Sequence, residues 1–343
     1  MDRPGSKVNV FLVHTQFQFF ITDHMIGSMR EFSSDDNYLV LDMDPGGASI
    51  ARGGWKEVIP LEPPVGGSVW GARRSCMSAM GKIGRILQSR GRASLFLSDI
   101  QWPLNNALYA WVAGGKGPRP EICNFPDGIA NLQLVYPNAK QKAKNVLKYL
   151  LGLAWGCPYY PYGGDIVGLE RSDRIYSLLP EAISGALDKE IVRIPPVVPL
   201  VASRKTSACL FVGQNYDYFM PRKEFRKLCE ESARFTMGLG YTDHVYKPHP
   251  FESTDESRRI FEQQGFVVLD DNRSVEEVFL HEQYRCVVSH NSSCLAHLKL
   301  MFGDAVRCIS FMNGKTIRYT NVDEDAIAKM VGVFRICGIE QYE

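Results

Sequence analysis

The feature that most constrains the fold of this chain is an alternation of short apolar runs with longer amphipathic stretches, which occurs twice. Short apolar runs bounded by turn residues predict strands, and apolar residues three and four positions apart predict helices. Strands that alternate with helices are typical of parallel sheets with crossover helices. At 343 residues, the chain is long enough for two such domains. We therefore predict an α/β protein with two Rossmann-like domains that face a central cleft.

The predicted domains are residues 1–190 and residues 191–343. In the first domain, strands are expected at 7–14, 37–44, 57–60, 93–98 and 121–125, and helices at 16–31, 75–90, 103–112 and 142–153. In the second domain, strands are expected at 208–212, 244–247, 266–269, 286–289 and 306–311, and helices at 222–237, 255–264, 275–280, 293–301 and 323–334. The alternation weakens after Tyr176, and the proline-rich stretch 191–201 is expected to cross between the domains.

Charge and cysteine content narrow the functional class. Lysine and arginine together number 39 and aspartate and glutamate 38, so the net charge is +1. This balance argues against a general nucleic-acid binder, which usually carries a basic excess. The nine cysteines are odd in number and form no CxxC pair, and several lie in apolar runs. Such a pattern is typical of a reducing cytoplasm and not of a disulfide framework.

Neither a secretory signal nor a membrane-spanning helix is predicted. The first five residues, Met1-Asp2-Arg3-Pro4-Gly5, are polar and lack an apolar core. The longest apolar run, 149–156, is broken by glycine and is too short to span a bilayer. We interpret it as a helix end that leads into the aromatic loop 155–162. That loop is expected to pack as core or loop, with contact to an acceptor or a lipid surface as the alternative.

The first polar constellation, His14-Thr15-Gln16-Phe17-Gln18, lies where the first strand meets its helix. Thr15 is suited to cap that helix, and its hydroxyl and the Gln18 amide are also suited to contact a ligand. No GxGxxG and no GxxxxGK[ST] follows, so neither a dinucleotide fingerprint nor a P-loop is present.

The second constellation, Asp127-Gly128, follows the strand at 121–125. Aspartate before glycine is common in turns, and a carboxylate at a strand end is also placed to act as a general base. A metal is not expected, because the seven histidines form no HExxH. The triplet Asp42-Met43-Asp44 has a DxD form, and we interpret it as a solvated strand end. A Ser–His–Asp hydrolase of the α/β class is also not indicated, since GxSxG is missing.

The third constellation is the loop Tyr246-Lys247-Pro248-His249-Pro250, just past the strand at 244–247. Ligands of open α/β sheets lie beyond the carboxyl ends of strands. Proline on both sides stiffens the loop, Lys247 adds positive charge, and His249 has a side chain that titrates near neutrality. The sequence predicts that this loop, including Pro250, grips an anionic phosphate-bearing donor. A surface turn with a solvated histidine is the alternative.

The fourth constellation, Ser289-His290-Asn291-Ser292-Ser293, precedes the predicted helix at 293–301. Hydroxyls and free backbone N–H groups at a helix N-terminus form a ready anion site. A single N-cap explains one serine of this group but not Ser289, Asn291, Ser292 and Ser293 together. The turn at Gly213-Gln214 is expected to bring backbone close to the same ligand.

Taken together, Thr15-x-x-Gln18, Asp127-Gly128, His249-Pro250 and Ser292-Ser293 resemble the motif set of bacterial sialyltransferases and polysialyltransferases. These are GT-B glycosyltransferases that use a CMP-activated nonulosonic acid. The order of the motifs and their places at strand ends match across most of the chain. The resemblance implies that residues 1–190 bind the acceptor and residues 191–343 the CMP-sugar. It also implies an inverting, metal-independent reaction without a cofactor, in which the CMP-sugar is a substrate.

The resemblance implies a role for each matching position. Asp127 would deprotonate the acceptor hydroxyl, and His249 would meet the donor phosphate as general acid. Ser292 and Ser293 would bind that phosphate, and the Gly213-Gln214 turn would lie near the nucleotide. Thr15, Gln18, Lys247, Pro250, Ser289 and Asn291 complete the expected substrate-binding set.

One position departs from the family pattern. The family has two acidic residues before the glycine, whereas this chain has Pro126 in the first place. Either Asp127 takes the role of the base or the base lies elsewhere, with Asp99 as the best reserve. The missing carboxylate also suits a non-catalytic GT-B-like protein that binds a nucleotide sugar. A Kdo or pseudaminic acid transferase and a sugar epimerase of GT-B form are further alternatives.

The resemblance also implies partners and a location. The partners would be the CMP-activated nonulosonic acid and a glycan or glycolipid acceptor of capsule or lipopolysaccharide biosynthesis. The protein would be cytoplasmic, with peripheral association at the inner face of the membrane. The acceptor, the linkage, the donor sugar and the oligomeric state are left open.

Overall fold

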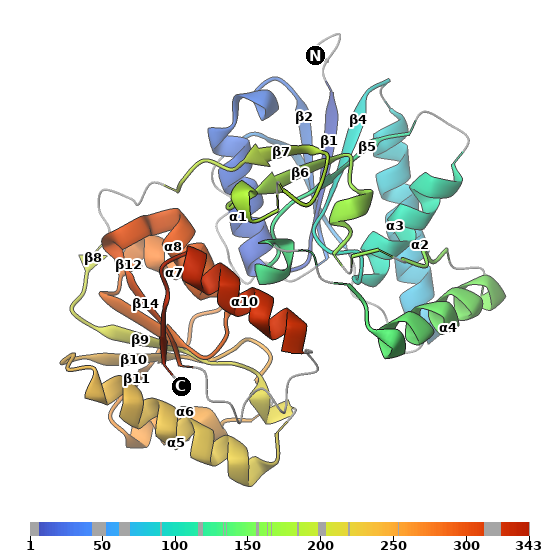
Figure 1. The fold of residues 1–343 in the computed structure, drawn as a ribbon. Helices are drawn as coiled ribbons and strands as arrows, with labels where there is room; N and C mark the ends of the chain where they lie inside the picture. Colours follow the sequence, from blue (N-terminus) through green and yellow to red (C-terminus); the bar gives the residue numbers. More distant parts are fainter. Residues whose placement is uncertain are drawn as a thin grey trace. The chain divides into compact units, whose positions relative to one another are not determined.

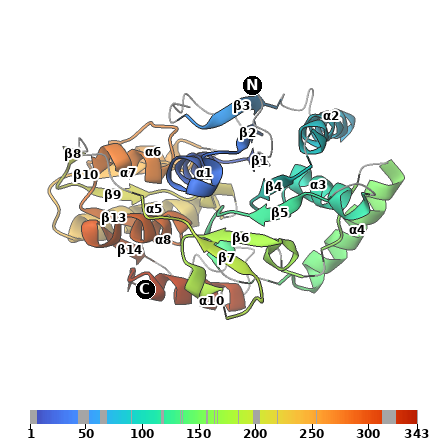
Figure 2. The same ribbon diagram turned by 90° about the horizontal axis from the view of Figure 1, so that it is seen from above.

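In this computed structural model the described residues are 7–42, 53–61, 69–89, 91–115, 119–132, 134, 136–155, 158–162, 164–165, 167–183, 185–197, 204–218, 220–252, 254–311 and 324–342. The chain divides into two compact units, Met1–Pro195 and Pro196–Glu343 (Figure 1). Each unit contains a parallel sheet with helices on both faces (Figures 1 and 2). The predicted α/β class is therefore confirmed.

In the described part of the first unit, the sheet has seven strands in the order β3-β2-β1-β4-β5-β6-β7, and all neighbours are parallel. The strands are β1 (Val8–Val13), β2 (Asp36–Leu41), β3 (Trp55–Pro60), β4 (Ala93–Leu97), β5 (Glu121–Asn124), β6 (Arg174–Ser177) and β7 (Glu190–Arg193). The helices are α1 (Gln16–Ser28), α2 (Val69–Gln88), α3 (Pro103–Gly114) and α4 (Ala139–Trp155).

The two faces of β1 explain the core of this unit. Side chains alternate across a strand, and Val8, Val10 and Leu12 lie in one apolar cluster with residues of α2 and α3. On the other face, the fully buried Phe11 stacks on Phe96 of β4, with ring centroids 4.0 Å apart. Both faces are apolar because helices cover both, as is usual for a parallel sheet.

Strands β6 and β7 were not predicted, and β7 takes up the start of the stretch 191–201 that was expected to cross between the domains. Both strands are short, and β7 is partly exposed along its length at the edge of the sheet, so neither has a long apolar run. Because β7 pairs with β6, the first unit extends to Pro195, beyond the predicted boundary at residue 190.

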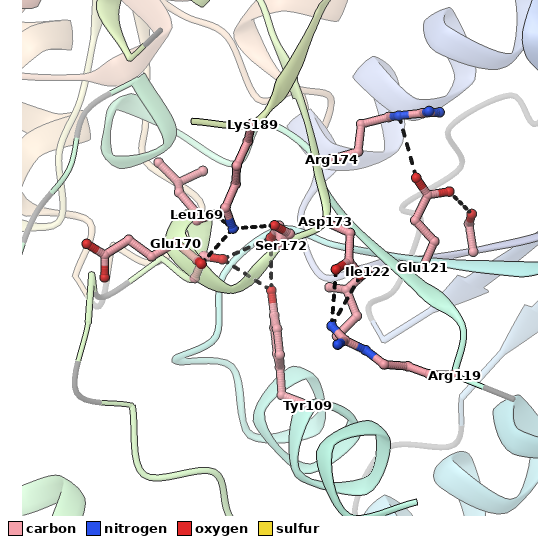
Figure 3. Close-up of polar contacts among 12 residues, drawn as sticks. Tyr109, Arg119, Glu121, Ile122, Leu169, Glu170, Ser172, Asp173, Arg174 and Lys189 are labelled. Carbon is pink, nitrogen blue, oxygen red and sulfur yellow. Dashed lines mark hydrogen bonds and ion pairs between the residues drawn. The ribbon is translucent and has the colours of Figure 1, made fainter. Parts of the chain in front are cut away.

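The segment before β6 is held by a buried polar network (Figure 3). The Lys189 ammonium donates to the carbonyl oxygens of Glu170 at 2.6 Å and Ser172 at 2.5 Å, and also to that of Leu169. The hydroxyls of Tyr109 in α3 and Ser172 lie 3.2 Å apart. These contacts join α3, the segment before β6 and the segment before β7, which holds β6 and β7 at their end of the sheet.

In the described part of the second unit, the sheet has the order β11-β10-β9-β13-β14-β15 and is also entirely parallel. The strands are β9 (Cys209–Val212), β10 (His244–Lys247), β11 (Val267–Val268), β13 (Cys286–Ser289), β14 (Arg307–Phe311) and β15 (Glu340–Tyr342), and β8 (Arg204–Lys205) pairs separately with β12 (Glu282–Gln283). The helices are α5 (Arg222–Gly238), α6 (Glu256–Gln263), α7 (Val275–His281), α8 (Ser293–Phe302) and α10 (Glu324–Ile336). The short strands β8, β12 and β15 were not predicted.

Phe11 offers a test of the first core. The substitution Phe11→Ala removes a ring that neighbours four other aromatic rings, those of Phe32, Trp55, Phe96 and Phe125. We expect it to lower the free energy of unfolding of the first unit by ~3–5 kcal/mol, because the cavity cannot collapse fully in a close-packed sheet. Urea denaturation followed by tryptophan fluorescence measures the change. The control Leu150→Ala changes a side chain that is 54% exposed on α4 and should shift stability by less than ~0.5 kcal/mol. Equal effects of the two variants would contradict this account of the core.

Candidate functional site

The candidate residues gather where the strand order of each sheet reverses. In both units the order follows the doubly wound pattern, and the reversal lies between β1 and β4 and between β9 and β13. Ligands of such sheets bind in the crevice at the carboxyl ends of the strands beside this point. His14 and Thr15 follow β1 and Asp99 follows β4, while Gly213 follows β9 and Ser292 comes shortly after β13.

In the first unit, Gln18 and Asp127 are brought together from distant parts of the chain. The Gln18 side-chain amide donates to Asp127 Oδ1 at 2.5 Å, and the indole N–H of Trp102 donates to Asp127 Oδ2 at 3.3 Å. Thr15 is the N-cap of α1 and accepts from the backbone N–H of Gln18 at 3.2 Å. Both oxygens of Asp127 therefore have a donor that fixes the orientation of the carboxylate, and Thr15 and Gln18 act in its positioning.

His14 belongs to the first constellation but was given no role by the sequence analysis, and the structure makes it a candidate site residue. Its ring stacks on Trp102 with centroids 4.6 Å apart and an interplanar angle of 3°. Its Nδ1 lies 3.0 Å from a carboxylate oxygen of Asp42, and its Nε2 lies 2.9 Å from Asn105 Oδ1. The Asn105 amide donates its N–H to the backbone oxygen of Asp99, which orients Oδ1 toward His14. Each ring nitrogen of His14 therefore has a polar partner. The available signal was a histidine between the strand end and the N-cap.

Asp99 differs from Asp127 in its surroundings. Burial raises the pKa of the Asp99 carboxyl to about 7. The hydrogen bond that Asp99 accepts from the backbone N–H of Gln101, at 2.7 Å, acts in the opposite direction and lowers this pKa. The negative charges of Asp127 and Asp165 raise this pKa further. The first unit thus holds two neighbouring carboxyl groups in different environments, the arrangement by which proteins separate acid from base.

The DxD triplet lies mostly outside the described residues, since Met43 and Asp44 are not among them. Asp42 is described and pairs with His14. Among the residues that the structure describes, no group of three or more His, Cys, Asp or Glu side chains is placed to hold a metal ion.

In the second unit, Glu252 organises the loop that carries His249. One carboxylate oxygen accepts from the Tyr246 hydroxyl at 2.6 Å and from the His249 backbone N–H at 3.0 Å. The other accepts from the Ser257 hydroxyl at 2.6 Å. A Cβ at Gly213 would lie 2.6 Å from this carboxylate and 2.7 Å from the Tyr246 hydroxyl, so the loop packs only against a glycine. No sequence pattern pointed to Glu252.

A hydrogen bond within its own loop decides which ring nitrogen of His249 carries the proton. Its Nδ1 lies 3.1 Å from the backbone N–H of Phe251 and accepts from it. Burial lowers the pKa of His249, which favours the neutral ring near neutral pH. A neutral ring that accepts at Nδ1 carries its proton on Nε2. His249 is therefore set to donate a hydrogen bond from Nε2.

The other residues of the loop have different surroundings. Lys247 is buried and its ammonium donates to the carbonyl oxygen of Asp271, while burial lowers its pKa. Pro250 is exposed. A cavity of about 290 Å³ beside them is lined by Pro248, His249, Pro250, Arg258, Leu269 and Asn272, among others. Its volume lies at the small end of the range for ligand pockets.

The segment after β13 divides into a buried and a more exposed part. Ser289 is fully buried and its hydroxyl donates to the carbonyl oxygen of Val212 at 2.8 Å, which ties β13 to the end of β9. Asn291 accepts from the Tyr216 hydroxyl at 2.6 Å. Ser292 is the N-cap of α8, Ser293 is its first residue, and both are half-buried. Near Gly213, the Gln214 amide donates to the Gly213 carbonyl oxygen at 3.0 Å.

A family comparison matches part of the chain. Residues 168–308 match the family model described as alpha-2,8-polysialyltransferase (POLYST). The matched range includes Gly213, His249 and Ser292 but not Asp127. No curated protein matches this chain in sequence.

Solved structures resemble the whole chain in fold. TcCGT1 in complex with UDP gives a TM-score of 0.54 at 10% identity, covering 98% of this chain and 86% of that one. A putative UDP-N-acetylglucosamine 2-epimerase from Listeria monocytogenes gives 0.51 at 9%, covering 89% and 79%. UDP-GlcNAc 2-epimerase from Methanocaldococcus jannaschii, in complex with UDP-GlcNAc and UDP, gives 0.50 at 10%, covering 96% and 92%. These neighbours are GT-B glycosyltransferases and epimerases, which confirms the predicted fold family.

The environment of Asp99 predicts a dependence of stability on pH. Its pKa is about 7 in the folded state and near its ordinary value of about 3.9 when unfolded. Between these values the folded chain keeps a proton that the unfolded chain has released, so stability falls as the pH rises through this window. We expect Asp99→Asn to stabilise the first unit at pH 8 by ~2–3 kcal/mol more than at pH 5. Urea unfolding at both pH values, with the exposed-carboxylate variant Glu57→Gln as control, measures this difference. A gain that is equal at both pH values would contradict the raised pKa.

Proposed function

We propose that the chain is a sialyltransferase-like glycosyltransferase of the GT-B fold, and that it transfers sialic acid or a related nonulosonic acid from a CMP-activated donor. Transfer of Kdo or pseudaminic acid is the alternative. The acceptor is a cell-surface glycan of capsule or lipopolysaccharide type. The transfer inverts the anomeric carbon and needs no metal. The first unit binds the acceptor and the second unit binds the donor.

The observation that carries this proposal is His249, a neutral Nε2–H donor at the carboxyl end of β10 inside the family-matched range. A hydrogen bond from Nε2 to a phosphate oxygen stabilises the negative charge that grows as CMP departs. Ser292 and Ser293, at the N-terminus of α8, supply hydroxyl and backbone donors for the same phosphate. The cavity beside His249 and Pro250 then receives part of the nucleoside.

The other residues proposed for the donor side hold the loops of the second unit in position. Gly213 lets the His249 loop pack closely, Glu252 holds that loop in place, and Lys247 braces it against the segment after β11. Ser289 ties β13 to β9 beneath the phosphate site. Gln214 and Asn291 line the same end of the sheet as polar contacts for the donor.

On the acceptor side, we propose Asp127 as the general base. The hydrogen bonds from Gln18 and Trp102 orient its carboxylate, and an oriented carboxylate within reach of an acceptor hydroxyl can take its proton. The acceptor oxygen forms a bond to the anomeric carbon while the bond from that carbon to the phosphate oxygen breaks. The acceptor proton passes to the carboxylate, and the bonding electrons leave with CMP.

Asp99 is the second candidate for the base, because a pKa of about 7 suits proton abstraction near neutral pH. The acid limb of the pH–rate profile distinguishes the two carboxyl groups. If Asp99 is the base, the rate falls as the pH drops below about 7, and the Asp99→Asn variant has no activity at any pH. If Asp127 is the base, Asp99→Asn retains turnover above pH 7 and Asp127→Asn loses it.

Pro126 favours a second candidate function, a non-catalytic protein that binds a nucleotide sugar, because the family's first carboxylate is missing. The test is CMP release from CMP-sialic acid in the presence of candidate acceptors, with product masses as the readout. We expect Asp127→Ala and His249→Ala to lower kcat/KM by ~10²–10⁴. The control Glu57→Gln and added EDTA should leave the rate unchanged. CMP binding without any transfer to a broad acceptor panel would favour the binding protein instead.

The tautomer of His249 gives a separate prediction for donor binding. The amide nitrogen of Gln stands near the place of imidazole Nε2, whereas that of Asn stands near Nδ1. We therefore expect His249→Gln to keep CMP affinity within about tenfold of the wild type, and His249→Asn to weaken it as much as His249→Ala. Isothermal titration calorimetry with CMP measures all three. Better rescue by Asn than by Gln would show that the ring presents Nδ1 and not Nε2.

A further inference from the structure

Helix α4 is attached to the first unit along one narrow side. Asn145 and Gly152 are buried and Gln141 is half-buried, and these positions lie on one side of a helix. Asn145 accepts from the Tyr159 hydroxyl at 3.0 Å and donates to the Tyr162 carbonyl oxygen at 3.5 Å. In both ribbon views α4 lies at the margin of its unit (Figures 1 and 2). The other side chains that the structure describes on α4, up to residue 153, are exposed.

Large apolar side chains of α4 are exposed, and three leucines lie opposite Asn145. Leu147, Leu150 and Leu151 are 57%, 54% and 37% exposed, and at 3.6 residues per turn they stand on the far side of the helix. Val146, Tyr149 and Leu153 are also exposed and lie between that side and the attached side. Single exposed apolar residues are common, but a contiguous row of leucines on one helix marks an interaction surface. A helix of a soluble domain normally turns its apolar face toward the core, so this helix is inverted relative to its own unit.

The charge of α4 indicates what covers this row. The helix contains four lysines, Lys140, Lys142, Lys144 and Lys148, and neither aspartate nor glutamate. All four lysines are exposed. A helix with leucines on one face and lysines beside them fits an interface that is apolar inside and anionic at its surface, which describes a lipid bilayer. An anionic glycan would use the lysines and leave the leucines in water.

We propose that α4 is a docking helix that lies in the plane of an anionic membrane surface. Its leucines enter the boundary between headgroups and acyl chains, and its lysines contact the headgroups. Among the described residues no helix is long and apolar enough to cross a bilayer. The tyrosines of the loop 158–162 pack against the body and support α4 from behind. This inference does not depend on the identity of the donor.

The test is binding of the full chain to vesicles. We expect binding to phosphatidylcholine vesicles with about 30% phosphatidylglycerol and at least tenfold weaker binding to pure phosphatidylcholine. Leu147→Gln with Leu150→Gln should weaken binding at least tenfold, because Gln preserves helix propensity and removes the inserted groups. Changing the four lysines to Gln should weaken binding by about fivefold for each charge removed.

Matched controls lie on the second unit. Lys223→Gln with Lys227→Gln removes exposed lysines from α5, and Ile336→Gln removes a side chain that is 63% exposed at the end of α10. Both should leave vesicle binding unchanged, and all variants should keep the wild-type unfolding temperature and the turnover of a water-soluble acceptor. Binding that depends on the lysines but not on the leucines would overturn the proposal in favour of a polyanion. If the full chain self-associates without lipid and the leucine variant does not, the membrane proposal is overturned. The partner of α4 would then be a second copy of the chain.

Discussion

Reversal of strand order beside the first strand of each sheet is the constraint on which the rest of the structure depends. At that point the connections from neighbouring strands leave in opposite directions, so a crevice opens at the carboxyl edge. In the first unit the turns after β1 and β4 carry His14 and Asp99, and the turn after β5 adds Asp127. In the second unit the turns after β9 and β13 carry Gly213 and Ser292. In each unit the strand order therefore brings these polar side chains to the carboxyl edge of the sheet.

Burial then sets the chemical character of these groups. Asp99 is pushed toward its neutral form by burial and by neighbouring carboxylates, whereas Asp127 is held as an oriented acceptor by the amide of Gln18 and the indole of Trp102. His249 is also driven toward neutrality, but its loop decides which nitrogen keeps the proton. Burial thus makes Asp99 a candidate base in the first unit and His249 a hydrogen-bond donor in the second.

The exposed face of α4 has a different origin from these sites. It comes from the order of residues within one helix, because Asn145 and Gly152 face the body while Leu147, Leu150 and Leu151 face away. An enzyme that modifies a lipid-linked glycan gains from being held at the surface where its acceptor is anchored. The proposed acceptor and the proposed docking helix are therefore compatible, although they rest on different residues.

Local periodicity by itself determined the α/β class, the main helices and most central strands of the two sheets, because both sheets are covered by helices and leave strong apolar runs in the sequence. It also located Asp127, His249 and Ser292 at strand ends. Edge strands such as β7 are short and half-exposed, so their formation depends on pairing with a neighbour. Tertiary structure alone decided that Gln18 reaches Asp127 across 109 positions of the chain and that Glu252 sits beneath the histidine loop. Those contacts depend on how strands are ordered and how deeply loops are buried, which no short stretch of sequence encodes.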